Sequence, residues 1–325
     1  MIRQRIPDEV LSAAHARARA REARDWPEAD RLRGEIEAAG WKVVDRGTDF
    51  ALSAATPPDV AEGNRVRYGS SQSVPSRLNE AAAGLATVVL VATEWPDDLT
   101  RCIAALEATS PLGTSVAIVA DGPSAEQEAA LVDIDSAAAD RHLPIEVTWT
   151  SERLGHAAAT NIGLRRVGAP VAILLDPSLE PTGDIVTPLV GALDDPTVAV
   201  AGGWGIVSRD LRKFEDAPAG DVDAIEGYCQ AFRRSDYAQL GPLDEHFRFY
   251  RNLDIWWSLV LRDTGDAGPA RRAVRLDGLS IRQFEHRGYT SLPDDERDRQ
   301  SKRNFYRILD RFGARTDLLV RPGGS

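Results

Sequence analysis

Short apolar segments alternate with amphipathic helical segments from residue 84 onward, and this alternation restricts the fold more than any other feature of the chain. Within 96–109, Leu99, Ile103 and Leu106 recur at helical spacing and form one apolar stripe. Short apolar strands separated by helices indicate an α/β fold with a mostly parallel central sheet and helices on both faces. The apolar segments are LATVVLVAT (85–93), TSVAIVADG (114–122), PIEVTWTS (144–151) and PVAILLD (170–176).

Polar side chains stand where three of these predicted strands end. Thr93, Asp121 and Asp176 each follow an apolar run. Ligands of such sheets bind beyond the carboxyl ends of the strands, so we expect these side chains to converge on one cleft. The Asp121 carboxylate can accept hydrogen bonds from hydroxyl or N–H groups of a ligand, and the alternative is a turn residue before Gly122.

Composition excludes several classes of protein. The formal net charge of −11 argues against a broad nucleic-acid-binding surface, which needs clustered Lys and Arg. The chain has no apolar run of about 18 residues and no apolar segment behind its first arginines. Cys102 and Cys229 form neither a disulfide framework nor a paired metal motif. We therefore expect a cytoplasmic protein without a membrane span.

The first 53 residues form a separate region in this interpretation. Residues 8–40 read as an α-helical hairpin, in which Asp25 is placed to cap the second helix and Glu28 follows three positions later. The alternating pattern of 41–53 predicts two short strands. We expect residues 1–53 to form a small module, 54–82 a linker or a segment draped over the main domain, and 83–325 the main domain.

The N-terminal module resembles a short piece near the C-terminus of cysteinyl-tRNA synthetases. The resemblance covers residues 5–53 and is carried by ARDWPEADRLRGEIEAAGW and VVDRGTDFAL. None of the synthetase's catalytic or zinc-binding residues lies in this piece, so the resemblance implies no aminoacylation. Basic and acidic residues are nearly balanced over 1–46, and we expect a docking module that contacts another domain or subunit.

The main domain resembles family 2 glycosyltransferases of the GT-A fold. The resemblance spans about residues 84–315 and begins with VVLVATEWPDDLTRCIAAL, VAIVADGPS and RLGHAAATNIGLRRVGAPVAILLDPSLEP. It implies a Rossmann-like domain that binds a nucleotide-sugar donor, usually acts with inversion and usually needs a divalent metal. The positions it assigns to the nucleotide are Thr93, Glu94, Asp121, Asn161 and Asp176.

The second half of the resemblance lies in residues 225–265, IEGYCQAFRRSDYAQLGPLDEHFRFYRNLDIWWSLVLRDTG. It places Asp254 on the family's general base, which deprotonates the acceptor hydroxyl. A carboxylate at a helix start beside aromatic residues becomes more basic through partial desolvation. A capping role at the helix start is the alternative for Asp254. Arg234 and Trp256 are the candidates for contacts with phosphate and acceptor.

The metal site predicted by the resemblance is incomplete. Asp176 is its first carboxylate, but Ser178 stands where the family has a second aspartate, which places the metal in question. His286 follows a predicted strand where many family members keep a histidine near the metal and diphosphate, and a neutral imidazole is a suitable ligand. The predicted metal ligands are Asp176 and His286, with Ser178 as a further candidate, and Mn or Mg as the cation. Arg287 in the same loop is a candidate for a phosphate contact.

Two functions follow from these patterns. The first is an inverting glycosyltransferase that moves a sugar from a UDP- or GDP-sugar to an unidentified sugar or other acceptor, with Asp254 as base. The alternative is a weakly active or inactive GT-A-like domain that binds sugars, nucleotides or a protein partner. The discriminating observation is whether Asp176, Asp254 and His286 share one cleft. Donor, acceptor and a homo-oligomeric state stay open at this stage.

Overall fold

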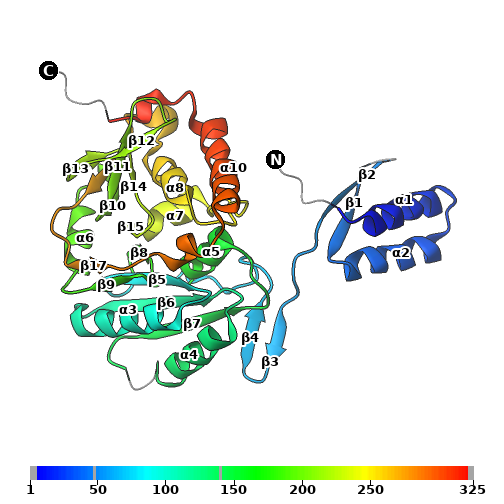
Figure 1. The fold of residues 1–325 in the computed structure, drawn as a ribbon, viewed down its shortest axis with the longest axis horizontal. Coiled ribbons are helices and arrows are strands. Elements are labelled where there is room, and N and C mark those ends of the chain that lie inside the picture. Colours follow the sequence, from blue (N-terminus) through cyan, green and yellow to red (C-terminus); the bar gives the residue numbers. More distant parts are fainter. Residues whose placement is uncertain (1–5, 47–48, 139–140, 321–325) are drawn as a thin grey trace. The chain divides into compact units, whose positions relative to one another are not determined.

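The computed structural model describes residues 6–46, 49–138 and 141–320. The chain divides into two compact units, Met1–Asp59 and Val60–Ser325. Within the described residues, no helix is both long enough and apolar enough to cross a bilayer. We describe the two units separately (Figure 1).

The first unit is a helical hairpin followed by a strand hairpin. It contains α1 (Asp8–Glu22), α2 (Trp26–Ala38), β1 (Trp41–Arg46) and β2 (Asp49–Ala54). Its small core is formed by Val10, Ala14, Ile36 and Trp41. The predicted cap is confirmed, because the Asp25 carboxylate accepts from the Glu28 N–H at 3.2 Å. Arg17 on α1 joins Asp45 on β1 at 2.8 Å, so an ion pair links the two hairpins.

A ten-stranded sheet forms the centre of the second unit. Its middle is parallel: β5 runs alongside β6 with Ala86 opposite Thr114 and Ala92 opposite Ala120, and β8 and β7 extend the parallel region on either side. Across the sheet the strands are β13 (Gly220–Val222), β16 (Arg272–Arg275), β10 (Val198–Gly202), β15 (Cys229–Arg233), β8 (Val171–Leu175), β5 (Ala86–Ala92), β6 (Thr114–Ala120), β7 (Ile145–Thr150), β4 (Arg65–Tyr68) and β3 (Val60–Glu62).

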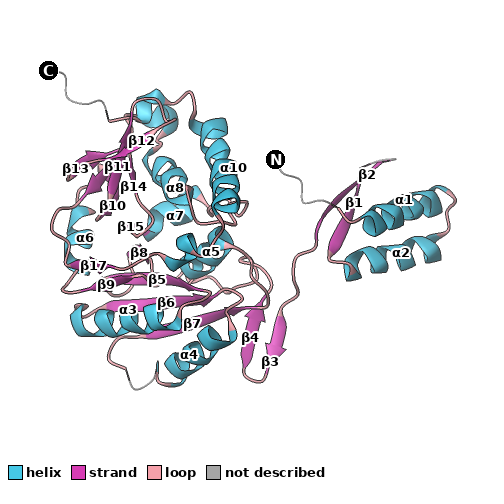
Figure 2. Ribbon diagram, viewed as in Figure 1, coloured by secondary structure: helices cyan, strands magenta, loops and turns pink. Residues whose placement is uncertain are grey.

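Helices cover both faces of this sheet, as Figure 2 shows. Alternate side chains of β5 point to the two faces: Val88 and Leu90 belong to the apolar cluster that includes side chains of α3 and α4, whereas Val89 belongs to the cluster that includes side chains of α5 and α8. The α/β prediction is therefore confirmed. The helices are α3 (Pro96–Thr109), α4 (Ala125–Ser136), α5 (His156–Arg165), α6 (Val186–Ala192), α7 (Arg234–Leu240), α8 (Leu253–Arg262), α9 (Arg287–Thr290) and α10 (Asp294–Phe312).

Short strands outside the main sheet complete the second half of the unit. They are β9 (Leu179–Pro181), which pairs with β17 (Ile281–Gln283), and β11 (Gly205–Ser208), which lies between β12 (Phe214–Asp216) and β14 (Ala224–Ile225). The pairing of β17 with β9 brings the residues that follow β17 back to the end of β8. This return places two segments about 100 positions apart in the sequence beside one another.

Residues 60–68 belong to the main sheet, which the irregular composition of 54–82 does not reveal. They form β3 and β4, and β4 runs parallel to β7 with Arg67 opposite Trp149. The guanidinium groups of Arg65 and Arg67 lie 4.0 and 5.2 Å from the Trp149 ring centroid. Cation–π contacts with a buried tryptophan thus stabilise a strand whose own sequence has little apolar surface.

Gly202 on β10 provides a test of the packing in the second half of the sheet. A Cβ there would lie 2.2 Å from the Cys229 carbonyl oxygen and 2.3 Å from Ile225 Cγ2, so Gly202→Ala forces backbone to move. Overpacking of this kind should lower the free energy of unfolding by about 2 kcal/mol, measured by urea denaturation. In α6, Gly191 has open space around its Cβ position, and Gly191→Ala is the matched control. Equal stability of the two variants would contradict this packing.

Candidate active site

A cavity of about 740 Å³ lies at the carboxyl end of β8 and extends under β12 and the start of α8. Asp176, Asp254 and His286 all line it. Asp176 immediately follows β8, Asp254 lies in the first turn of α8, and His286 lies between β17 and α9. The three side chains on which the two functional interpretations depend are therefore in one cleft.

Asp176 and His286 form a direct pair within this cavity. Asp176 Oδ2 lies 3.0 Å from His286 Nε2, and Asp176 Oδ1 accepts from the Ser178 N–H at 2.8 Å. Burial alone would raise the pKa of Asp176, but the hydrogen bonds from His286 and Ser178 outweigh it and lower that pKa. Burial opposes the charge on His286, yet the Asp176 carboxylate raises the pKa of the imidazole. The site therefore keeps a carboxylate ionised beside a readily protonated histidine.

Aromatic rings hold the His286 imidazole in place. The Tyr250 ring stacks on it with centroids 4.5 Å apart and planes 25° apart, and the Tyr228 ring meets it edge-on at 6.1 Å. His156, the first residue of α5, also lines the cavity, and burial lowers the pKa of its imidazole to about 4. His156 is therefore neutral at physiological pH, whereas His286 can carry charge.

The donor set at Asp176 suits a cation that the protein holds only in part. No cluster of three His, Cys, Asp or Glu side chains that could hold a metal occurs among the described residues. A carboxylate and an imidazole 3.0 Å apart can nevertheless supply two ligands to Mn²⁺ or Mg²⁺, and Mg²⁺ in particular takes much of its shell from phosphate oxygens and water. Asp176 and His286 thus fit a cation whose coordination a diphosphate completes, with the buried Ser178 beside them.

Asp254 is fixed by backbone groups from two elements. Its Oδ2 accepts from the Gly227 N–H at 2.7 Å, and its Oδ1 accepts from the Ile255 N–H at 2.9 Å. Burial nonetheless raises the pKa of Asp254, which makes the carboxylate a better proton acceptor. The residue ties the start of α8 to the loop before β15, and it also faces the cavity.

The predicted nucleotide residues at the ends of β5 and β6 lie outside the residues that line this cavity. Asp121 is 1% exposed, and its carboxylate accepts from the Leu154 N–H at 2.7 Å and the Gly155 N–H at 3.1 Å. These bonds fix the turn that leads into α5. The Thr93 carbonyl accepts from the Ser124 N–H at 2.8 Å, and Glu94 forms an exposed ion pair with Arg153 at 3.3 Å. Their contact with a nucleotide stays a prediction.

Two other predicted site residues are buried in polar contacts. Asn161 is 0% exposed and bonds the Leu243 carbonyl and the Tyr237 hydroxyl, so it braces α5 against the segment after α7. Arg234 is buried, and its guanidinium donates to the backbone carbonyls of Arg77 and Glu80. A contact of either side chain with a diphosphate or phosphate stays a prediction.

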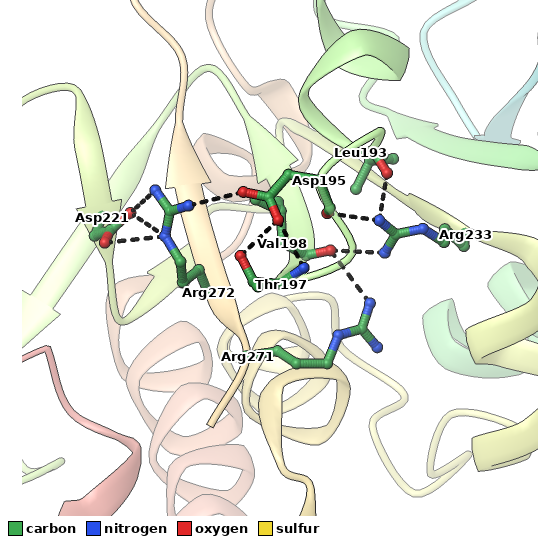
Figure 3. A network of polar contacts seen from close by, with 8 residues as sticks. All are labelled: Leu193, Asp195, Thr197, Val198, Asp221, Arg233, Arg271 and Arg272. Carbon is green, nitrogen blue, oxygen red and sulfur yellow. Dashed lines mark hydrogen bonds and ion pairs between the residues drawn. The ribbon is translucent and has the colours of Figure 1, made fainter. Parts of the chain in front are cut away.

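Arg233, adjacent to Arg234, is also structural. Figure 3 shows its guanidinium among the carbonyls of Leu193, Asp195 and Val198, with Arg271 reaching the Val198 carbonyl from the other side. Beside them, Arg272 bonds the carboxylates of Asp195 and Asp221. These contacts hold the connection between α6 and β10.

Both tryptophans of α8 are buried. Trp256 is 6% exposed and packs against Phe247 with ring centroids 5.6 Å apart, and its contact with an acceptor stays a prediction. Its neighbour Trp257 is 1% exposed and belongs to the same core cluster, and it also lines the cavity. Arg287 lies 3.5 Å from the Asp98 carboxylate and over the Trp95 ring, at the start of α9. It is placed beside the site without lining the cavity.

Sequence patterns missed one cavity residue with unusual chemistry, Glu226. It lies in the loop between β14 and β15, and burial raises the pKa of its carboxyl group to about 7, with the charges of Asp254 and Asp216 adding to the effect. In the sequence, Glu226 and Gly227 stand shortly before β15 without any recognisable motif. Their relation to the site is evident only from the hydrogen bond between the Gly227 N–H and Asp254.

The layered sheet and the carboxylate–imidazole pair at its strand ends define a GT-A transferase. The chain belongs to glycosyl transferase family 2, whose model matches residues 87–254. Two solved structures share the fold. One is GalNAc-T7 with UDP, GalNAc and Mn²⁺, with a TM-score of 0.58 and 15% identity over 70% of this chain and 48% of that one. The other is the mannosyltransferase PcManGT from Pyrobaculum calidifontis in complex with GDP-Man and Mn²⁺, with a TM-score of 0.52 and 15% identity over 76% of this chain and 71% of that one.

The N-terminal unit is similar to a small part of cysteine–tRNA ligases. A stretch of 47 residues is 49% identical to the enzyme of Rubrobacter xylanophilus, and 50 residues are 44% identical to that of Opitutus terrae. The stretches cover only 10% and 11% of those enzymes. This similarity confirms the short resemblance and carries no synthetase activity to the chain.

Proposed function

We propose that this chain transfers a sugar from a nucleoside diphosphate sugar to an acceptor hydroxyl with inversion at the anomeric carbon. The observation that carries the proposal is the shared cavity of Asp176, His286 and Asp254. Family membership supports the type of reaction, and the UDP and GDP-Man complexes of the two similar structures favour a UDP- or GDP-sugar donor with Mn²⁺ or Mg²⁺.

Asp176 and His286 would hold the donor end of the cavity. Their side chains are positioned to bind a divalent cation, which when bound supplies Lewis-acid stabilisation to the leaving diphosphate. When no cation is bound to its imidazole, His286 is readily protonated because its pKa is raised, and the imidazolium can instead donate to a phosphate oxygen. These two residues therefore orient the diphosphate.

Asp254 would act at the acceptor end. It takes the proton of the acceptor hydroxyl while that oxygen attacks the anomeric carbon, and the bond to the diphosphate breaks on the opposite face. Direct displacement of this kind inverts the anomeric configuration. The backbone bonds from Gly227 and Ile255 fix the direction of the carboxylate, so it need not reorganise during the reaction.

Product stereochemistry tests this proposal. The protein is incubated with Mn²⁺, a panel of UDP- and GDP-hexoses and simple methyl glycoside acceptors, and nucleotide release and the anomeric coupling of the product are followed by NMR. We expect nucleotide release with one class of donor and a product of inverted configuration. A retained configuration would contradict the role of Asp254, and the absence of transfer from every donor would favour the binding-module alternative.

A further inference from the structure

Glu226 lies at the acceptor end of the same cavity on a rigid loop. The loop joins β14 to β15, and the Glu226 N–H donates to the Trp204 carbonyl at 3.0 Å. The side chain of Gln230, on β15, donates to the Ile225 carbonyl at 2.6 Å and to the Asp254 carbonyl at 3.1 Å. The loop is thus held on the first turn of α8, where Asp254 lies.

Glu226 lines the cavity and is half-buried, and its carboxylate has no hydrogen-bond donor among the described residues. The charged groups that act on it are Asp254 on α8, Asp216 on β12, Arg275 on β16 and Arg251 before α8. Burial raises the pKa of the Tyr228 phenol in the same loop, and the charge of Glu226 adds to this effect. Burial and the two carboxylates outweigh the arginines, so the pKa of Glu226 rises to about 7.

Gly227, which follows Glu226 in the chain, connects the Glu226 loop to Asp254. The Gly227 N–H that follows Glu226 bonds Asp254 Oδ2 at 2.7 Å, and a Cβ on Gly227 would lie 3.4 Å from the same oxygen. Both residues line the cavity, and the charge of Asp254 opposes ionisation of Glu226. Such a pair binds its first proton more tightly than an isolated carboxylate does.

We propose that Glu226 is the second half of the catalytic base, so that the proton leaving the acceptor hydroxyl is taken up by the Asp254–Glu226 carboxylate pair. This inference rests on the proposed glycosyl transfer and adds a residue to it. The acceptor O–H bond breaks, its proton binds the pair, and its oxygen forms the new bond to the anomeric carbon. The electron pair of the broken sugar–phosphate bond leaves with the diphosphate. Proton uptake removes the unfavourable effect of the Asp254 charge on ionised Glu226 and thereby favours the step.

The coupling can be measured without any substrate. In protein labelled with ¹³C at the glutamate carboxyl, the Glu226 signal is assigned by its loss in Glu226→Gln and is titrated from pH 4 to 9. We expect a midpoint near 7 in the wild type and a shift toward the ordinary glutamate value in Asp254→Asn. An unchanged midpoint in Asp254→Asn would overturn the pairing, whatever donor the enzyme uses.

The catalytic use of the pair is tested with the donor that shows turnover in the stereochemical assay. We expect Glu226→Gln to transfer sugar about 100-fold more slowly at pH 7.5, to lose the acidic limb of the pH profile near 7 and to bind UDP as the wild type does. Glu226→Asp keeps a carboxylate and should recover part of the rate. The control is Glu215→Gln on β12, an exposed carboxylate paired with Lys213.

One outcome separates this inference from the proposed function. A Glu226→Gln protein that matches Glu215→Gln in rate and pH profile, while Asp254→Asn is inactive, would overturn the inference and leave the proposed function intact.

Thermal unfolding at pH 4.5 and pH 8 checks the folding of the variants. The folded-state pKa of Glu226 is raised, so ionisation of Glu226 destabilises the wild type as pH rises toward 7 and above. Glu226→Gln is therefore expected to have the higher Tm at pH 8 and an unchanged Tm at pH 4.5.

Discussion

Replacing Asp176 with asparagine is expected to weaken Mn²⁺-dependent binding of UDP or GDP at least 10-fold and to lower sugar transfer by about 1000-fold. The amide can still accept from the Ser178 N–H, so the turn after β8 should persist. The negative charge beside His286 is lost, and with it the charged ligand for a cation that bridges to the diphosphate. Calorimetric titration of UDP and GDP with and without Mn²⁺ measures the binding effect.

The same substitution has a consequence for His286 that can be measured without a nucleotide. The Asp176 carboxylate raises the pKa of His286, so this pKa should fall in Asp176→Asn, as seen by NMR of the imidazole protons. Glu180→Gln, on the neighbouring β9, removes a carboxylate that pairs with Arg282 instead and serves as the control. Undiminished metal-dependent binding in Asp176→Asn would show that the cation is held elsewhere.

Replacing Asp254 with asparagine should lower the rate of transfer by about 1000-fold and leave nucleotide affinity unchanged. Asparagine has nearly the same shape, but it cannot take up the acceptor's proton, and general-base catalysis typically contributes 10²- to 10⁴-fold. UDP affinity should persist because the donor end of the cavity, at Asp176 and His286, is formed by other elements. Single-turnover rates and calorimetry on the same preparation separate the two effects.

A structural role alone for Asp254 predicts a different pattern. Asp254 also bonds the Gly227 N–H, so a purely capping residue would show its loss as a lower Tm, with activity falling only as far as the protein unfolds. Glu215→Gln again provides the matched exposed control. Full activity of folded Asp254→Asn would remove Asp254 from the mechanism.

The sequence predicted the fold and the place of Asp176 at a strand end, because both depend on local order along the chain. An apolar run such as 171–175 predicts a buried strand, and an acid at its end lies at the ligand-binding edge of a parallel sheet. Asp176 therefore reaches the cavity by its position alone. The positions of His286 and Asp254 followed from the order of the family's motifs along the chain.

Other side chains have contacts that depend on partners far away in the sequence. The Arg234 guanidinium donates to carbonyls more than 150 positions earlier, and the Asn161 side chain forms hydrogen bonds with groups about 80 positions later. Trp256 and Trp257 are adjacent and both belong to the core, and only the tertiary structure shows that Trp257 also lines the cavity. Glu226 acquires its chemistry from Asp254 and Asp216, which no spacing around position 226 reports. Local sequence patterns do not predict side-chain contacts that the tertiary structure determines.

A crystal structure of the protein with UDP and Mn²⁺ tests the central claim most directly. The account predicts an anomalous manganese peak beside the Asp176 carboxylate and the His286 imidazole, with the diphosphate next to it and the cavity open toward Asp254. A nucleotide bound outside the cavity, or manganese held by other residues, would contradict the assignment of this cleft as the active site.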